Sequence, residues 1–224
     1  MPERLNKYLA TNLGVSRREA DDLIASGKVL IDDAKATIGD KVLANNTIKV
    51  DGKPVKPAEL IYIALHKPPG YVSSHKRQDS TPTLYELLPP EYRNLKTVGR
   101  LDKDTSGLIL LTNDGDFTYQ MTHPKFAKFK EYEAEIDQPL APLHQQIIAD
   151  FGVELTDGTS KLGLTSLDNT RKKWQITMSE GRNRQIRRTF GALGYTITKL
   201  HRKTFGKYQL NTLPEGSWEK LDKA

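Results

Sequence analysis

The stretch Gly99-Arg100-Leu101-Asp102-Lys103-Asp104-Thr105-Ser106-Gly107, followed at once by Leu108-Ile109-Leu110-Leu111-Thr112-Asn113, carries the strongest signal for the fold. It predicts a glycine-bounded turn with two carboxylates that leads into a short apolar strand, buried on both faces. A buried strand holds its neighbours rigidly, so a polar side chain at its mouth can be positioned for chemistry. On spacing alone the alternative is a charged loop that caps a core strand, because turns favour Asp and Gly for backbone reasons.

Composition and charge narrow the class of protein. With 224 residues, of which 37% are hydrophobic and 28% charged, the chain is predicted to be globular, with one large or two small domains. The net charge of +6 favours a polyanionic partner. Residues 171–207 hold 11 Lys and Arg against 1 acidic residue, whereas residues 1–59 hold 10 against 9. A phosphate-binding surface is therefore expected in the late segment.

Several classes of site and location are excluded or disfavoured. The chain has 0 cysteines, which excludes disulfides, thiol catalysis and cysteine-ligated zinc. No histidines stand at metal-ligand spacing, so neither a metal nor a cofactor is expected. No run approaches the roughly 20 apolar residues of a membrane span, and Met1–Lys7 lacks an apolar signal core. We expect a cytoplasmic protein without membrane contact, and nothing in the sequence demands more than a monomer.

The first 59 residues are predicted to form a separate small module. Apolar residues at helical spacing predict a helix over 4–13, and Ser16 with Glu19 matches a capping box that starts a second helix, which ends at Gly27. Short strands follow around 29–31 and 48–50, with Asp51-Gly52 as a hairpin turn. The proline-spaced segment 53–59 is a plausible linker. A catalytic domain over 60–224 is expected to follow.

Two of these regions resemble known families. Arg100-Leu101-Asp102 with the following Lys103–Leu108 resembles the signature of RNA pseudouridine synthases, specifically of their RsuA-like branch, which acts on ribosomal RNA. Lys67-Pro68-Pro69-Gly70-Tyr71 resembles the opening motif of these enzymes, which helps to shape the site. Residues 2–50 resemble an S4 domain, a small RNA-binding module. That resemblance implies that Arg17, Arg18 and Lys28 contact RNA, the alternative being a solvated helix face.

A second motif spans Glu180–Phe190 and contains Arg184, Arg187 and Arg188. After a predicted strand over 174–178, it is expected to begin a helix that ends at Gly194 and carries these arginines on one face, at i, i+3 and i+4. Near a helix N-terminus they add to the positive end of the dipole, so a phosphate or carboxylate is expected to neutralise them. The alternative is a solvated arginine stripe. The segment resembles the third motif of RsuA-like synthases.

The resemblance assigns roles to individual residues. It implies Asp102 as the catalytic aspartate, acting as nucleophile or proton acceptor at the sugar, and Arg182 as the cation that keeps it ionised. Tyr132, in a Lys-x-Tyr pattern, is implied to stack on the flipped base and to take the C5 proton. Ile186 is the candidate floor of the site. Arg100 is placed to fill the gap left by the flipped nucleotide, and Lys67 is grouped with the substrate-binding residues.

The sequence thus predicts an α+β protein: an S4-like RNA-binding module over 1–59, and a pseudouridine synthase domain with a mixed, mainly antiparallel sheet over 60–224. The expected activity is isomerisation of uridine to pseudouridine in ribosomal RNA or in a partly assembled ribosomal subunit. One alternative is a non-catalytic ribosome-assembly protein with a vestigial site. A weaker one is a nucleotide-processing hydrolase that uses Asp102 and Asp104 as an acid/base pair.

Overall fold

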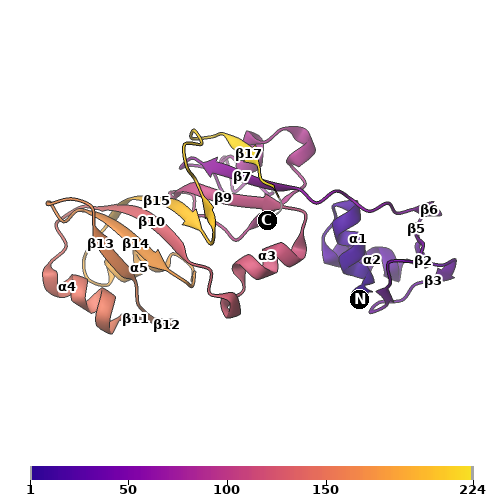
Figure 1. The fold of residues 1–224 in the computed structure, drawn as a ribbon, viewed down its shortest axis with the longest axis horizontal. Helices are drawn as coiled ribbons and strands as arrows, with labels where there is room; N and C mark the ends of the chain where they lie inside the picture. The colour runs from indigo at the N-terminus through magenta and orange to yellow at the C-terminus, as the bar shows by residue number, and fades with distance from the viewer. Residues whose placement is uncertain (1, 223–224) are drawn as a thin grey trace.

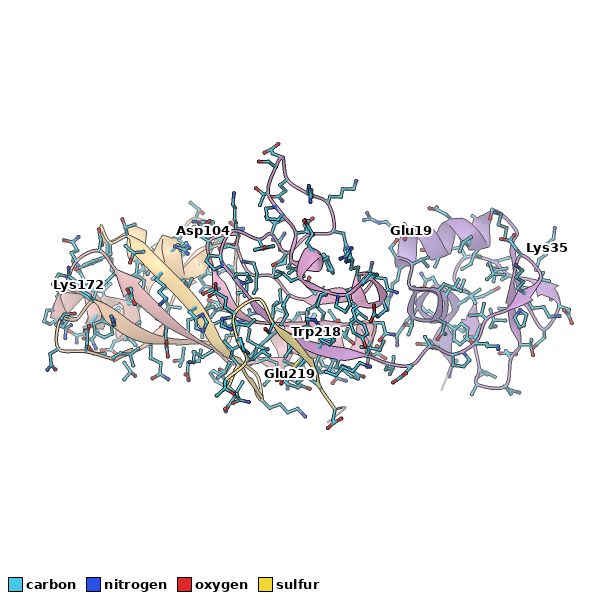
Figure 2. The ribbon with its side chains drawn as sticks, turned by 90° about the horizontal axis from the view of Figure 1, so that it is seen from above. Glu19, Lys35, Asp104, Lys172, Trp218 and Glu219 are labelled. Carbon is cyan, nitrogen blue, oxygen red and sulfur yellow. The ribbon has the colours of Figure 1, made fainter. Side chains whose placement is uncertain are left out.

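The computed structural model describes residues 2–222 as an elongated molecule with two units (Figure 1). Seen from above, Lys35 and Lys172 lie at opposite ends, and Glu19 lies on the side of the small unit that faces the larger one (Figure 2). Each unit has a hydrophobic core of its own. None of the described helices has the length and apolar character needed to cross a lipid bilayer.

The small N-terminal unit packs two helices against short strands. Its elements are β1 (Glu3–Arg4), α1 (Leu5–Leu13), α2 (Arg17–Ala25), β2 (Val29–Ile31), β3 (Ala34–Lys35), β4 (Lys41–Val42), β5 (Ile48–Val50) and β6 (Lys53–Pro54). One sheet has the order β3-β2-β5-β6, and β1 pairs with β4. The core comes from both helices and the strands: Leu5, Leu9, Ala20, Ile24, Val29, Ala36, Val42 and Ile48.

The turn between α1 and α2 follows from local sequence. The backbone N–H of Glu19 donates to the Ser16 hydroxyl at 3.1 Å, and the Ser16 N–H donates to the Glu19 carboxylate at 2.6 Å. This reciprocal pair satisfies donors that a helix N-terminus leaves free. Gly27, with φ +72°, follows the end of α2. The predicted capping box and the left-handed glycine are both confirmed.

Polar contacts hold the linker against the small unit and connect the small unit to the larger one. The Ala58 N–H donates to the Asn12 side-chain oxygen at 2.8 Å, and Lys7 forms an ion pair with Asp116 at 2.5 Å. Asp116 lies in the first turn of α3 (Gly115–Thr122). The small unit is therefore held beside the helix that follows the buried strand.

The larger unit is built on a nine-stranded sheet. Its strands are β7 (Tyr62–Lys67), β8 (Lys96–Val98), β9 (Ser106–Thr112), β10 (Lys130–Ile136), β13 (Gly163–Ser166), β14 (Lys173–Met178), β15 (Ile197–Phe205), β16 (Tyr208–Gln209) and β17 (Trp218–Lys220). The order is β13-β14-β10-β15-β9-β7-β17, with β8 on β9 and β16 on β15. The other elements are η1 (Leu84–Leu87), η2 (Pro90–Tyr92), α3, η3 (Pro124–Phe126), α4 (Pro142–Gln146), the π-helical turn η4 (Ile147–Phe151), the hairpin β11 (Val153–Leu155) and β12 (Gly158–Ser160), and α5 (Gln185–Gly191).

Strand β9 lies inside the larger unit, as its apolar sequence predicts. All seven of its residues are buried. Ile109 and Leu111 join a core cluster with α5 and η1, whereas Leu108 and Leu110 join a second cluster with α3. The two-sided burial is confirmed, and so is the α+β architecture with a mixed, mainly antiparallel sheet.

Strands β9 and β15 run parallel, whereas the other strand pairs of this sheet are antiparallel. This parallel pairing is short: His201 lies opposite Ser106, and Arg202 lies opposite Gly107. Gly107 has φ +110°, and a Cβ built on it would lie 2.2 Å from the Arg202 carbonyl oxygen. Only glycine permits this approach. No strand was predicted after Gly194, so β15, which lies at the centre of the sheet, was missed.

The surroundings of the histidine at this junction disfavour its charged form. His201 Nδ1 lies 2.8 Å from the Ser106 hydroxyl, and its ring is 5.2 Å from the His66 ring in an edge-on arrangement. Burial lowers the pKa of His201, and the charges of His66, Lys203 and Lys199 lower it further, against an opposing effect of Glu133.

We expect this histidine to make the protein sensitive to mild acid. Because the folded-state pKa lies below the ordinary value of about 6.5, the unfolded chain binds the proton more tightly than the folded one. The contribution to the free energy of unfolding is fully present above that ordinary value, and it is lost as the pH falls through the folded-state pKa. Urea denaturation at a series of pH values from 7.5 downward measures the effect.

His201→Gln is expected to flatten this pH dependence. His123→Gln provides the control, because His123 is exposed on the surface. An equally steep pH dependence in His201→Gln and in the wild type would contradict the assignment.

Candidate active site

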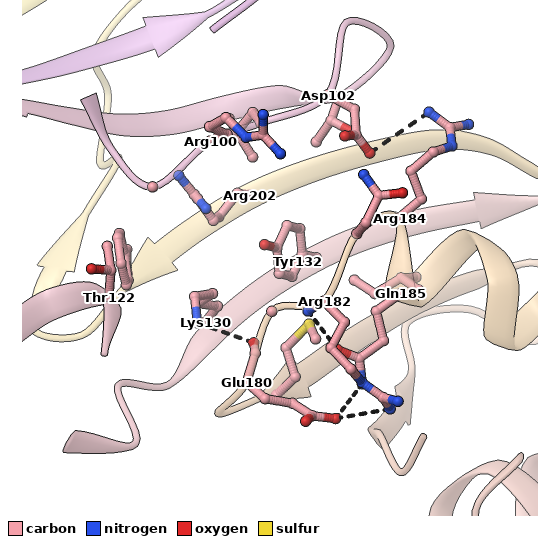
Figure 3. A pocket seen from close by; sticks show the side chains of 18 of the residues that line it. Arg100, Asp102, Thr122, Lys130, Tyr132, Glu180, Arg182, Arg184, Gln185 and Arg202 are labelled. Carbon is pink, nitrogen blue, oxygen red and sulfur yellow. Dashed lines mark hydrogen bonds and ion pairs between the residues drawn. The ribbon is translucent and has the colours of Figure 1, made fainter. Parts of the chain in front are cut away.

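A pocket of about 450 Å³ lies where the turn before β9 meets the segment between β14 and α5. The turn contributes residues 99–102 and Thr105, and the facing segment contributes residues 178–187. Strands β10 and β15 form its base with Lys130, Tyr132, Leu200 and Arg202, as the close-up shows (Figure 3). The two sequence motifs that lie about 80 residues apart therefore line one cavity.

Asp102 lies at the edge of this pocket beside a guanidinium group. Its Oδ2 is 3.7 Å from Arg184 Nη1, and the same nitrogen is 3.4 Å from Asp104 Oδ2 (Figure 3). The Asp102 side chain is 34% exposed, so a substrate can reach it. Arg184 connects the two motifs directly and places a positive charge beside the carboxylate.

A buried lysine holds the turn that carries Asp102 in place. Lys67, at the end of β7, is fully buried, and its ammonium donates to the carbonyls of Pro68 at 2.9 Å, Lys103 at 3.3 Å and Thr105 at 2.8 Å. Burial lowers its pKa to about 8. The expectation that Lys67 binds substrate is wrong, because the side chain has no exposed surface and does not line the pocket. It supports the turn instead.

The structure also corrects the expectation for Arg182. Its guanidinium does not face Asp102 but reaches the β11–β12 hairpin, where Nη1 donates to the Asp157 carboxylate at 2.9 Å and to the Gly158 carbonyl at 2.7 Å. Nη2 donates to the Thr159 carbonyl at 2.8 Å and lies 3.2 Å from Glu180. Arg184 takes the place beside Asp102 that was expected for Arg182. Arg182 holds the facing segment of the pocket to the hairpin.

The three arginines expected on one helix face point to different partners. Arg184 precedes α5, with φ +45°, and is not part of the helix. Arg187 is half-buried and donates to the carbonyls of Ile197 at 2.8 Å and Asp104 at 3.2 Å. Arg188 lies 2.7 Å from the Asp157 carboxylate, which lowers the pKa of Asp157. The three guanidinium groups therefore form ion pairs and hydrogen bonds with carboxylates and carbonyls of the protein itself.

Three other expected site residues line the same pocket. Tyr132 in β10 and Ile186 in α5 are buried, and Arg100 is exposed at the turn. Tyr132 lies between the turn and the facing segment, at the base of the cavity (Figure 3). A planar ring, an isoleucine and a carboxylate within one cavity can hold a flat base beside a group that acts on its sugar.

Outside this pocket, the three basic residues expected to bind RNA lie on the surface of the small unit. Arg17 and Arg18 are exposed at the start of α2, and Lys28 follows its end, 4.0 Å from Asp51. Within residues 2–222, no group of three or more His, Asp or Glu side chains is arranged to hold a metal ion.

Comparison with known proteins identifies the chain. Residues 61–192 match the family model described as RNA pseudouridylate synthase, and residues 3–48 match the S4 domain. The matched segment covers more than half of the sequence and contains Asp102, Tyr132 and Arg184. The chain is a member of the RNA pseudouridylate synthase family.

Relatives of this pseudouridylate synthase align along nearly its whole length. It is 36% identical to the ribosomal large subunit pseudouridine synthase B of Bacillus subtilis, over 98% of this chain and 92% of that protein. It is 35% identical to the ribosomal small subunit pseudouridine synthase A of Vibrio parahaemolyticus, over 97% and 95%. A crystal structure of a pseudouridylate synthase superposes with a TM-score of 0.70 at 31% identity, over 98% of this chain and 96% of that one.

Two pocket residues of this synthase were missed from the sequence. Arg202 lies in the strand that was not predicted, and Lys130 was noted only as part of the pattern that leads to Tyr132. A signal for Lys130 was present, since it lies two residues before Tyr132 and therefore on the same face of a strand. Arg202 had no such signal, because an arginine between a histidine and a lysine normally indicates an exposed segment.

Proposed function

We propose that this synthase isomerises uridine to pseudouridine in ribosomal RNA, with Asp102 as its catalytic aspartate. The observation that supports this most strongly is the position of the Asp102 carboxylate, next to Arg184 and in one pocket with Tyr132 and Ile186. The subunit names of the two relatives support ribosomal RNA as the substrate class.

The chemistry follows from these positions. The target nucleotide leaves the RNA stack, and its uracil lies on the Tyr132 ring with Ile186 as an apolar contact, which offsets part of the cost of unstacking. Asp102 acts at the sugar while the N1–C1′ bond breaks. The uracil then turns and bonds to C1′ through C5, and Tyr132 takes the C5 proton. Arg100, at the exposed edge of the pocket, fills the space left in the RNA.

We further propose that residues 1–59 and residues 60–224 have separate roles. The S4 unit docks the RNA through Arg17, Arg18 and Lys28, and the catalytic unit converts the uridine. The protein works as a monomer in the cytoplasm, on naked ribosomal RNA or on a partly assembled subunit.

The proposal is tested by tritium release from ribosomal RNA labelled at uridine C5, with naked RNA and partly assembled subunits as parallel substrates. The purified protein is expected to release tritium from one of them and to leave pseudouridine in its place. Binding of both substrates without release would instead identify a non-catalytic ribosome-assembly protein. Release of free uracil without pseudouridine would identify a hydrolase.

A further inference from the structure

Two basic side chains lie next to each other at the base of the pocket. Arg202 in β15 lies directly opposite Tyr132 in β10, so both side chains are on one face of the sheet. Lys130 lies two residues before Tyr132 and shares that face. The two cations pack on the same Phe205 ring, with Arg202 Cζ 5.0 Å and Lys130 Nζ 5.3 Å from its centroid. All three polar side chains line the pocket (Figure 3).

Neither of these two cations forms an ion pair with a carboxylate of residues 2–222. Arg202 is 2% exposed; its Nε donates to the Leu108 carbonyl at 2.7 Å, while its Nη2 has no hydrogen-bond partner among residues 2–222. Lys130 donates to the Glu180 carbonyl at 3.0 Å and the Lys128 carbonyl at 3.4 Å. Burial and the nearby Arg202 lower the pKa of Lys130 to about 8, against an opposing effect of the Glu180 charge.

Such a pair is costly in the empty protein. Removing a cation from water without an anionic partner is unfavourable, and two cations side by side repel each other. Groups held in this way are typical of sites where charge develops during a reaction, because they need no rearrangement when the charge appears. The pair is therefore expected to receive a ligand that is negative, or becomes negative, next to Tyr132.

We propose that Arg202 and Lys130 bind the carbonyl oxygens of the target uracil and stabilise the negative charge that the base acquires when its bond to the sugar breaks. This inference rests on the proposed function, because it needs a uracil on Tyr132. A backbone phosphate fits the position less well, since it would have to leave water and enter the base of the pocket.

The movement of electrons in the reaction explains why the base needs positive side chains beside it. When the N1–C1′ bond breaks, its electron pair stays with the uracil and is shared among N1, O2 and O4. Asp102 acts at the sugar, so it cannot also neutralise the base. The uracil anion turns, and its electron pair forms the C5–C1′ bond as Asp102 releases the sugar. The proton on C5 then leaves through the Tyr132 hydroxyl, the electrons of the C5–H bond restore the C5–C6 double bond, and N1 takes up a proton. Arg202 and Lys130 stabilise the anion between the two bonds.

The pair also explains the choice of base. Arginine and lysine only donate hydrogen bonds. They therefore donate hydrogen bonds to the two carbonyl oxygens of uracil, whereas cytosine places an amino group, itself a donor, at position 4. An RNA with cytidine at the target position is expected to bind less tightly in the pocket.

The test separates RNA binding from the chemical step. Arg202→Gln and Lys130→Gln are compared with wild type in single-turnover breakage of the N1–C1′ bond, in RNA that carries uridine or 5-fluorouridine at the target. This step is measured because 5-fluorouridine has no C5 proton to lose and cannot become pseudouridine. The Kd for RNA is measured separately. With uridine, Arg202→Gln is expected to slow bond breakage by about 100-fold, with Kd changed less than about threefold. The fluorine stabilises the uracil anion, so the loss is expected to be smaller with 5-fluorouridine.

Two further variants control the experiment. Lys203→Gln removes a charge from the same strand, where Lys203 pairs with Glu133 at 3.7 Å outside the pocket, and is expected to convert RNA at the wild-type rate. Lys130→Arg keeps the charge and is expected to restore most of the rate lost in Lys130→Gln. If Arg202→Gln fails to fold, the Lys130 variants carry the test.

Several outcomes would overturn the inference. A weaker Kd with an unchanged rate would assign the pair to a backbone phosphate. Equal losses on uridine and 5-fluorouridine would mean that the cations serve only the structure. A wild-type protein that converts no uridine would instead remove the proposed function, and with it this inference.

Discussion

Asp102→Asn is expected to abolish pseudouridine formation, lowering the rate by about 10⁴-fold, while RNA binding and the fold remain. The amide keeps the size of the side chain but has no charge, so it neither attacks the sugar carbon nor accepts a proton from it. The Arg184 contact weakens as well, but it lies at the pocket edge and contributes little to stability. Tritium release from C5-labelled RNA measures the activity, and RNA titration measures the binding.

Asp104→Asn is the matched control for this change. Asp104 lies in the same turn and contacts the same Arg184 nitrogen, but it does not line the pocket. We expect it to retain activity within about tenfold of wild type. If the two substitutions were equally damaging, the two carboxylates would act as a pair and the assignment of Asp102 alone would be wrong.

Gly107→Ala is expected to lower the free energy of unfolding by at least about 3 kcal/mol or to prevent folding. The added Cβ would lie 2.2 Å from the Arg202 carbonyl oxygen and 2.5 Å from the Arg202 nitrogen, and φ is +110°. Relief requires β9 and β15 to separate. The turn before β9 forms one wall of the pocket, and β15 forms part of its base. Urea denaturation of the purified protein measures the loss.

Gly115→Ala is the control for Gly107→Ala. Gly115 begins α3, and a Cβ there would meet nothing within 4 Å. Its effect on the free energy of unfolding is expected to stay within about 0.5 kcal/mol. A Gly107→Ala protein as stable as the wild type would mean that the two strands do not approach as closely as described.

The parts of the fold that were predicted correctly are those that local sequence determines. The capping box at Ser16 depends on residues three apart, and β9 depends on a continuous apolar run. Strand β15 was missed because its polar residues outnumber its apolar ones, and its pairing partners lie far away in the chain. Only the assembled sheet makes this segment a central strand.

The site also has features that could be predicted from the sequence and features that could not. The motifs bring Asp102, Tyr132 and Ile186 into one pocket, as the resemblance implied. The roles of individual basic residues were not predictable, because each role depends on the direction in which the side chain points. In the second motif, Arg184 points to Asp102, whereas Arg182 points to the β11–β12 hairpin. Lys67 was placed wrongly because a lysine is normally exposed.

The short parallel pairing of β9 with β15 also has a consequence for how the protein folds. Ser106 and His201 are 95 residues apart, so their contact closes a long loop, and the entropy of closure must be offset by few residue pairs. Contacts of such high sequence separation form slowly. The antiparallel pairings on either side, β8 with β9 and β10 with β15, close shorter loops and can form first, each with part of the pocket. We therefore expect the ability to bind a base to appear last during folding, after most of the secondary structure is in place.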